Sequence, residues 1–234
     1  MNKYIPTLLL LLGGMCVQSC GLTADKMTAN ESTDSLSTAN DLKTADLVFV
    51  SRPRGDGTGA SDLIHVAMLE VVGGDLNIID ATIRHGVDCH PIDTFFSDFV
   101  RHDGTLPDFI IKRVPSIDGK RVIHQAKAYL GRPYDVSFGR GTDALYCTEL
   151  VRESFVTADN DTLFHEVIMR FCDPNGSLPA YWERLFGNLG STPPEGQMGT
   201  TPWQMASSPL LENKGQLLRP LADNFLEKRK AVTK

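Results

Sequence analysis

The sequence predicts an α+β fold, in which a group of strands comes first and the main helices follow. Residues 46–50, 64–72 and 76–81 are rich in Val, Ile and Leu, and glycine-containing segments separate them, a pattern typical of antiparallel strands. Residues 119–130 and 147–155 instead carry apolar side chains at helical spacing. We therefore expect a small antiparallel sheet with helices packed against it.

The N-terminus indicates export. After a positively charged start, residues 8–12 form an apolar run that is too short for a comfortable membrane span, so residues 1–19 are interpreted as a signal peptide. The small or branched residues before Cys20 resemble a bacterial lipobox, which implies cleavage before Cys20 and attachment of diacylglycerol to its sulfur. Cys16 fits less well, because Gly13 stands where a lipobox usually carries Leu. An ordinary cleaved signal or an uncleaved anchor is the alternative.

Composition divides the remainder of the chain into a tether and one domain. Residues 20–41 are rich in small polar residues and nearly lack large apolar ones, so they cannot bury enough surface to offset the entropy of ordering. We predict a flexible tether there and one folded domain over residues 42–234. The net charge of −6 argues against a nucleic-acid-binding protein, and the basic cluster at 228–230 is interpreted as a solvated tail. No oligomerisation signal stands out, so we expect a monomer.

The predicted strands form an antiparallel meander. A glycine-rich loop at residues 51–60 separates the first two strands, and the Gly-Gly-Asp sequence at residues 73–75 supplies a tight turn between the second and the third. Residues 108–114 form a further strand, which Pro115 ends.

Residues 86–92 are interpreted as a loop that leads into an aromatic core segment at residues 95–99. At first sight His85, Cys89 and His90 suggest a metal site in this region. Their spacing matches none of the usual zinc patterns, and no second pair of ligands stands out, so we expect no metal here.

The C-terminal third is less regular. Apolar residues in the segment 161–172 fit a helix or a long strand, and the sequence does not separate the two. Residues 178–186 predict a short helix with Pro in its first turn, and Trp182 is assigned to the core. Residues 190–209 are rich in loop-forming residues. There Trp203 pins the loop to the core or, alternatively, offers an aromatic surface to a substrate.

Cys147 opens the second predicted helix, and this position has chemical consequences. Unpaired backbone N–H groups and the positive end of the helix dipole meet in the first turn, where they favour a thiolate over a thiol. The same N–H groups could hold the oxyanion of an acyl intermediate. Cys147 is therefore a candidate nucleophile if a histidine can reach it, and a buried structural cysteine is the alternative.

His65 and Asp80 are the candidates for a base and its orienting partner. Alternation along the strand places His65 on one face with Ala67, and Val66 and Met68 on the other. Asp80 lies on a neighbouring strand. A general base near a thiol needs one ring nitrogen within reach of the thiol and a partner for the other nitrogen. A single histidine on a strand is more often structural. The catalytic interpretation is favoured here because His65 follows a glycine-rich loop and precedes a strand that carries Asp80.

The order of these motifs resembles the circularly permuted NlpC/P60, or papain-like, fold, and within it the YiiX-type group. The matching motifs are IHVAML around His65, IIDAT around Asp80, GRPYD at residues 131–135 and YCTELV around Cys147. The segment 194–203 also resembles the end of that group. Ordinary NlpC/P60 enzymes carry the cysteine before the histidine, whereas here the order is reversed, which is the permuted arrangement.

The resemblance implies a Cys–His–acid catalytic set on a small α+β domain, with Cys147 as nucleophile, His65 as base and Asp80 as the residue that orients His65. Related sequences more often carry Glu where Asp80 stands. Tyr134 matches a tyrosine that lines the pocket of such proteins, so a contact with oxyanion or substrate is expected, with simple packing as the alternative. Glu149 is interpreted as a first-turn acid favoured by the helix dipole. No metal or organic cofactor is implied.

Export and the resemblance together predict a cysteine hydrolase of the cell envelope that cleaves amide bonds, as NlpC/P60 enzymes do in cell-wall peptides. It would be held at a membrane through Cys20 and face the periplasm or the outside. A thiol acyltransferase or lipid ester hydrolase is the alternative, because the permuted branch also resembles lecithin:retinol acyltransferase-like proteins. A non-catalytic binding lipoprotein is the third hypothesis. A long apolar groove favours lipid, and a polar cleft with charged groups favours peptide.

The remaining cysteines leave two alternatives open. Exported proteins lie in a disulfide-permissive space, and a Cys89–Cys172 bridge is the one bond compatible with a lipidated Cys20 and a free Cys147. The odd count is also consistent with no bridge, and we expect both thiols to be reduced and buried.

Overall fold

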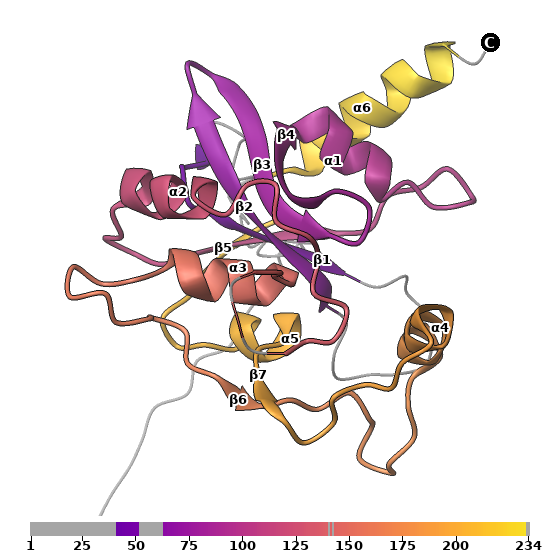
Figure 1. The fold of residues 1–234 in the computed structure, drawn as a ribbon. Coiled ribbons are helices and arrows are strands. Elements are labelled where there is room, and N and C mark those ends of the chain that lie inside the picture. Colours follow the sequence, from indigo (N-terminus) through magenta and orange to yellow (C-terminus); the bar gives the residue numbers. More distant parts are fainter. Residues whose placement is uncertain (1–40, 52–62, 140, 142, 233–234) are drawn as a thin grey trace, which may run out of the picture. The chain divides into compact units, whose positions relative to one another are not determined.

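The computed structural model describes residues 41–51, 63–139, 141 and 143–232 (Figure 1). All of these residues belong to one unit of the chain. The predicted signal peptide, Cys20, almost all of the predicted tether and most of the glycine-rich loop lie outside the described residues. Within the described ranges, no helix combines the length and the apolar character that a membrane crossing requires.

A six-stranded antiparallel sheet, ordered β4-β3-β2-β1-β5-β8, forms the centre of the fold. The consecutive pairing of its first strands confirms the predicted meander, and the mixture of this sheet with helices confirms the α+β class. The strands are β1 (Leu47–Ser51), β2 (Leu63–Val72), β3 (Asp75–Thr82), β4 (Gly86–Pro91), β5 (Phe109–Arg113) and β8 (Glu212–Gly215). A separate short pair consists of β6 (Val167–Ile168) and β7 (Met198–Gly199).

Helices cover both faces of the sheet (Figure 1). One apolar cluster joins the sheet to α2 (Gly119–Lys127), α3 (Cys147–Ser154) and α5 (Pro202–Ala206). A second cluster joins the opposite face to α1 (Ile92–Asp98) and α6 (Arg219–Val232). Val66 and Met68 belong to the first cluster, whereas Ala67 and Leu69 belong to the second, so the predicted alternation along β2 is confirmed.

A third cluster is almost entirely aromatic, and its buried residues lie between β5 and β8 in the chain. It holds α4 (Ala180–Leu189), which confirms the helix predicted over residues 178–186. Trp182 is buried in it, as predicted. Trp203 packs its ring against Phe171 and Trp182, at 5.7 Å between ring centroids in both cases, and therefore pins its segment to the core, although this segment forms the helix α5 and not a loop.

Two further segments differ from the predictions. Residues 86–92 were predicted as a loop, but they form the edge strand β4 and the start of α1, because pairing with β3 from Thr82↔Gly86 to Asn77↔Pro91 outweighs the low strand propensity of Asp, His and Pro. The segment 161–172 is neither a full helix nor a long strand, since it contains the two-residue strand β6 and an isolated bridge from Thr162 to Val156. Its Phe164 packs in the first cluster and its Met169 in the aromatic cluster, so its apolar residues serve two cores.

The C-terminal basic cluster is exposed, as predicted, but residues 228–230 lie on the helix α6. That helix was not predicted.

Gly86 is held in a backbone conformation and a space that favour glycine. Its φ is +67°, and a Cβ at this position would lie 2.3 Å from the carbonyl oxygen of Arg132. Val87 donates its N–H to that oxygen at 2.8 Å, so the two segments are tied together here. We expect Gly86→Ala to lower the free energy of unfolding by about 2 kcal/mol or more, measured by urea denaturation. Gly73→Ala is the matched control, because its φ is +61° and no described atom lies within 4 Å of its Cβ. An equal loss in both variants would contradict a role for the close approach to Arg132.

Candidate active site

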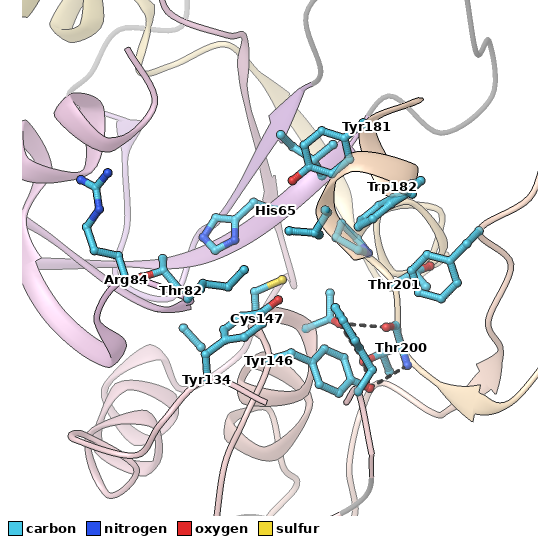
Figure 2. Close-up of a pocket in the computed structure, with 18 of the residues that line it drawn as sticks. His65, Thr82, Arg84, Tyr134, Tyr146, Cys147, Tyr181, Trp182, Thr200 and Thr201 are labelled. Carbon is cyan, nitrogen blue, oxygen red and sulfur yellow. Dashed lines mark hydrogen bonds between the residues drawn. The ribbon is translucent and has the colours of Figure 1, made fainter. Parts of the chain in front are cut away.

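A cavity of about 320 Å³ lies beside the start of α3 (Figure 2). Strands β2 and β3, the end of α1, the segment before α3 and the aromatic cluster all contribute to its wall. The two charged side chains at its edge, Arg84 and Asp98, are bonded to each other at 2.5 Å. Most of the remaining wall is aromatic or aliphatic and includes Ile64, Phe99, Phe138, Phe171, Tyr181 and Leu185.

Cys147 is the first residue of α3 and lines this cavity. The preceding residue, Tyr146, is extended and is the N-cap, so the backbone N–H groups of the first turn surround the thiol. Leu150 and Val151 bury the apolar side of α3 in the first cluster, which fixes the direction in which the helix start points. The predicted position of Cys147 in the first helical turn is confirmed.

The structure brings His65 and Asp80 together. The Nε2 atom of His65 lies 2.8 Å from Oδ2 of Asp80, and the two residues are only 8% and 1% exposed. Leu69 on β2 is paired with Ile78 on β3, so their side chains point to the same face of the sheet. Because side chains alternate along a strand, His65 points to the same face as Leu69, and Asp80 to the same face as Ile78. The imidazole also packs against Phe99, at 5.4 Å between ring centroids, which restrains its orientation.

His65 interacts with Cys147 as well as with Asp80, and Figure 2 shows its ring over the thiol. Since Nε2 faces Asp80, the other ring nitrogen is the one available to the sulfur. Burial by itself lowers the pKa of His65, but the hydrogen bonds to Asp80 and Cys147 and their charges outweigh it and raise this pKa to about 10. The arrangement therefore favours an imidazolium between a carboxylate and a thiol.

Tyr134 lines the same cavity beside Cys147 (Figure 2). It follows the turn at Gly131, where the predicted Gly-Pro turn is confirmed by a φ of +82°. Burial raises the pKa of Tyr134 well above its ordinary value, and the neighbouring Cys147 adds to this effect. The phenol is therefore neutral at physiological pH and can donate a hydrogen bond.

Glu149 lies in the first turn of α3, as predicted, but its surroundings disfavour the charged form of its carboxyl. Its carboxyl is buried, and its Oε2 has no partner among the described residues. Burial, followed by the charge of Asp135, raises its pKa from 4.5 to about 8, although the N–H groups of Tyr146 and Gly141 oppose this. The carboxyl reaches back to the N-cap Tyr146, as in a capping box.

The buried Glu149 predicts a stability that depends on pH. Because its pKa is higher in the folded than in the unfolded protein, its contribution is fully present below about pH 4.5 and is lost as the pH rises through about 8. We expect Glu149→Gln to unfold like the unaltered protein at pH 5 and to be more stable than it by about 2 kcal/mol at pH 9, measured by urea denaturation. The same substitution at the exposed Glu183 controls for the loss of one carboxylate. Equal differences at both pH values would contradict this prediction.

Hydrogen bonds among Tyr146, Thr148 and Thr200, which were not predicted, stabilise the wall of the cavity opposite His65. The N–H of Thr200 donates to the hydroxyl of Tyr146 at 3.2 Å, and the Thr200 hydroxyl donates to Thr148 at 2.9 Å. Thr148 in turn donates to the carbonyl oxygen of Thr200 at 3.0 Å. The start of α3 is thereby bonded to the chain that enters α5 (Figure 2). Neither threonine carries a sequence signal that separates it from an ordinary loop or helix residue.

The cysteines other than Cys147 stay apart from this site. Cys89 and Cys172 are both free, which agrees with the predicted reduced state. Both were predicted to be buried, but the structure shows them only half-buried. Burial raises the pKa of both thiols, and the nearby carboxylates of Glu70 and Glu195 add to this effect.

The sequence of this chain matches a known protein family. Residues 41–213, which are most of the chain, match the family described as a permuted papain-like amidase enzyme, YaeF/YiiX, C92 family. The comparison with curated proteins gives no match. A crystal structure described as the metalloprotein YiiX from Escherichia coli O157:H7 superposes with a TM-score of 0.55 at 20% identity, over 74% of this chain and 97% of that one. This likeness shows a shared fold.

The description of YiiX as a metalloprotein raises the question of a metal in this chain. In the part of the chain that the structure describes, no three His, Cys, Asp or Glu side chains converge so as to hold a metal ion. His85 and His90 lie 6.2 Å apart between ring centroids, and Nδ1 of His90 lies 3.7 Å from Oδ2 of Asp88. The described residues therefore do not fit a metal centre, and the chemistry below uses none.

Proposed function

This chain belongs to the family of permuted papain-like amidases, and we propose that it is a cysteine hydrolase of amide bonds at the cell envelope. The observation that carries the proposal is the geometry at one cavity wall. Cys147 begins a helix there, His65 interacts with it, and Asp80 holds the far side of the imidazole at 2.8 Å.

The proposed mechanism uses a thiolate–imidazolium pair. The Cys147 thiolate attacks a carbonyl carbon, and backbone N–H groups at the start of α3 stabilise the tetrahedral oxyanion. The phenol of Tyr134 donates a hydrogen bond to the same oxyanion or to the substrate. His65 gives its proton to the leaving amine, which leaves a thioester on Cys147. Water, activated by the now neutral His65, then hydrolyses the thioester.

The proposed substrate is an amide bond in cell-wall peptides. The resemblance of the motifs to NlpC/P60 enzymes supports this, and so does the predicted lipid anchor at Cys20, which would hold the domain close to the wall. In this proposal the mature protein is a monomer tethered through residues 20–41 on the periplasmic or the outer side of a membrane.

The lining of the cavity favours a second candidate, an acyltransferase or a hydrolase of acyl esters. Aromatic and aliphatic side chains make up most of the wall, and its charged pair, Arg84 and Asp98, is satisfied internally. An apolar acyl group would fill such a cavity at a lower desolvation cost than a charged peptide.

Product analysis distinguishes the two candidates. The whole protein is incubated with purified peptidoglycan fragments and, separately, with phospholipids, and the products are identified by mass spectrometry. Protein whose thiols have been alkylated with iodoacetamide is the control. A new peptide amine that is absent from the control supports the amidase, whereas released fatty acid or acyl transfer supports the second candidate. Turnover that survives alkylation would contradict both.

A further inference from the structure

The cavity beside Cys147 has two chemically different ends. Figure 2 shows Tyr181 and Trp182, which come from α4, on one side of Cys147, and Arg84 on the other side. Arg84 belongs to the turn between β3 and β4, and Asp98, its partner, is the last residue of α1. The two substituents of a carbonyl group point away from each other. A substrate attacked at Cys147 is therefore expected to place one substituent at each end.

The guanidinium of Arg84 has hydrogen-bond donors left for a ligand. Its Nη1 donates to Oδ1 of Asp98 at 2.5 Å, and the described residues offer it no other bonded partner. A guanidinium carries five N–H donors in a planar fork that matches a carboxylate. The side chain of Arg84 is 70% exposed, so a ligand at the open edge of the cavity can reach these donors.

The carboxylate of Asp98 is shared between Arg84 and His85. Its Oδ1 is bonded to Arg84, and its Oδ2 lies 3.3 Å from Nε2 of His85, so each oxygen already faces a nitrogen. A second carboxylate could therefore bind the remaining N–H groups of Arg84 without displacing Asp98. Among the described residues that line the cavity, Arg84 is the one arginine or lysine.

The opposite end suits an uncharged, apolar group. Phe138, Phe171 and Leu185 line it together with the rings from α4, and a charged group would lose its hydration there. In the proposed reaction the amine leaves first and the acyl group stays on Cys147. The amine must depart through the open edge, where Arg84 is exposed, while the acyl group remains against the buried aromatic wall.

We propose that the substrates are N-acylated amino acids, whose acyl chain lies against the aromatic wall and whose free carboxylate binds Arg84, an inference that rests on the proposed function. The reaction breaks the C–N bond of the amide. Cys147 forms a thioester with the acyl group, and the amino acid leaves with a proton from His65. Water then breaks the thioester, which releases a fatty acid and restores the thiol.

The test compares charged and uncharged substrates on the whole protein. The probes are the N-octanoyl derivatives of glycine, β-alanine and 4-aminobutyric acid, which place the carboxylate at increasing distance from the amide, and the primary amide of each, which lacks the charge. We expect at least one acid to be hydrolysed with a kcat/KM about three- to tenfold higher than that of its own amide. Release of octanoic acid is measured by mass spectrometry.

Matched Arg→Gln variants complete the test. Arg84→Gln removes the charge, so the ratio of kcat/KM between acid and amide should fall close to one. Arg170→Gln is the control, because Arg170 is 63% exposed and faces Glu195 at 3.7 Å but does not line the cavity, and it should keep the ratio. A ratio that survives in Arg84→Gln, no preference for any acid, or faster cleavage of the reversed amide N-octylsuccinamic acid would overturn the proposal.

Failure of the proposed function gives a different result. Calorimetry on the whole protein carrying Cys147→Ala measures binding of the same acids and amides without turnover. Binding that prefers the acid and needs Arg84, without hydrolysis by the unaltered protein, would leave the carboxylate site standing and count against the hydrolase. Hydrolysis of peptidoglycan fragments or phospholipids in preference to every N-octanoyl acid would leave the hydrolase standing and overturn the proposed substrate class.

Discussion

Replacing Cys147 by alanine is expected to lower kcat/KM by about 10⁴-fold or more, because the residue proposed to form the covalent intermediate is lost. The fold should survive, since the change removes one buried sulfur atom, and we expect the free energy of unfolding to fall by only about 1 kcal/mol. Steady-state kinetics on the substrate identified by product analysis, together with urea denaturation, measure both quantities.

Cys89→Ala and Cys172→Ala are the matched controls for this prediction. Both residues are free thiols outside the cavity, so both variants should retain full activity. Burial and neighbouring carboxylates raise the pKa of Cys89 and Cys172, and these thiols should react slowly with iodoacetamide at pH 7. Cys147, paired with the protonated His65, should react first. Activity that persists in Cys147→Ala, or that is lost in Cys89→Ala, would refute the assignment.

The positions of the three proposed catalytic residues could be predicted because these residues lie on regular elements. Alternation along a strand places His65 on a defined face, and a neighbouring strand in the same meander carries Asp80 to that face. Helical periodicity places Cys147 in a first turn. In each case a local rule with a fixed period determines the side chain direction, and one sequence is enough to apply it.

The opposite wall could not be predicted for the same physical reason. Trp182 and Thr200 come from segments that are arranged by packing between two cores, without one continuous periodic face. Edge strand β4 was missed because its polar residues gain their conformation from pairing with β3. Glu149 was placed correctly in the first helical turn, but its burial and the nearby charge of Asp135 come from tertiary packing, which no local period predicts.

Asp80 is expected to act as a positioning residue. It does not contact the substrate in the proposed mechanism, but its removal should impair catalysis through His65. Asp80→Ala leaves the buried Nε2 of His65 without its partner at 2.8 Å, so the imidazole is free to turn away from Cys147. We expect kcat/KM to fall by about 10²- to 10⁴-fold. The retained fold is checked by circular dichroism and urea denaturation.

Asp80→Asn separates orientation from charge. The amide oxygen can still accept the hydrogen bond from His65, so the loss of rate should be smaller than in Asp80→Ala. The carboxylate charge, however, is one of the causes that raise the pKa of His65 to about 10. Without it the imidazolium loses its proton at lower pH, so the alkaline limb of the kcat/KM profile should move to lower pH. A purely structural role for Asp80 would lower the rate at every pH and leave that limb in place, and such a profile would contradict the assignment.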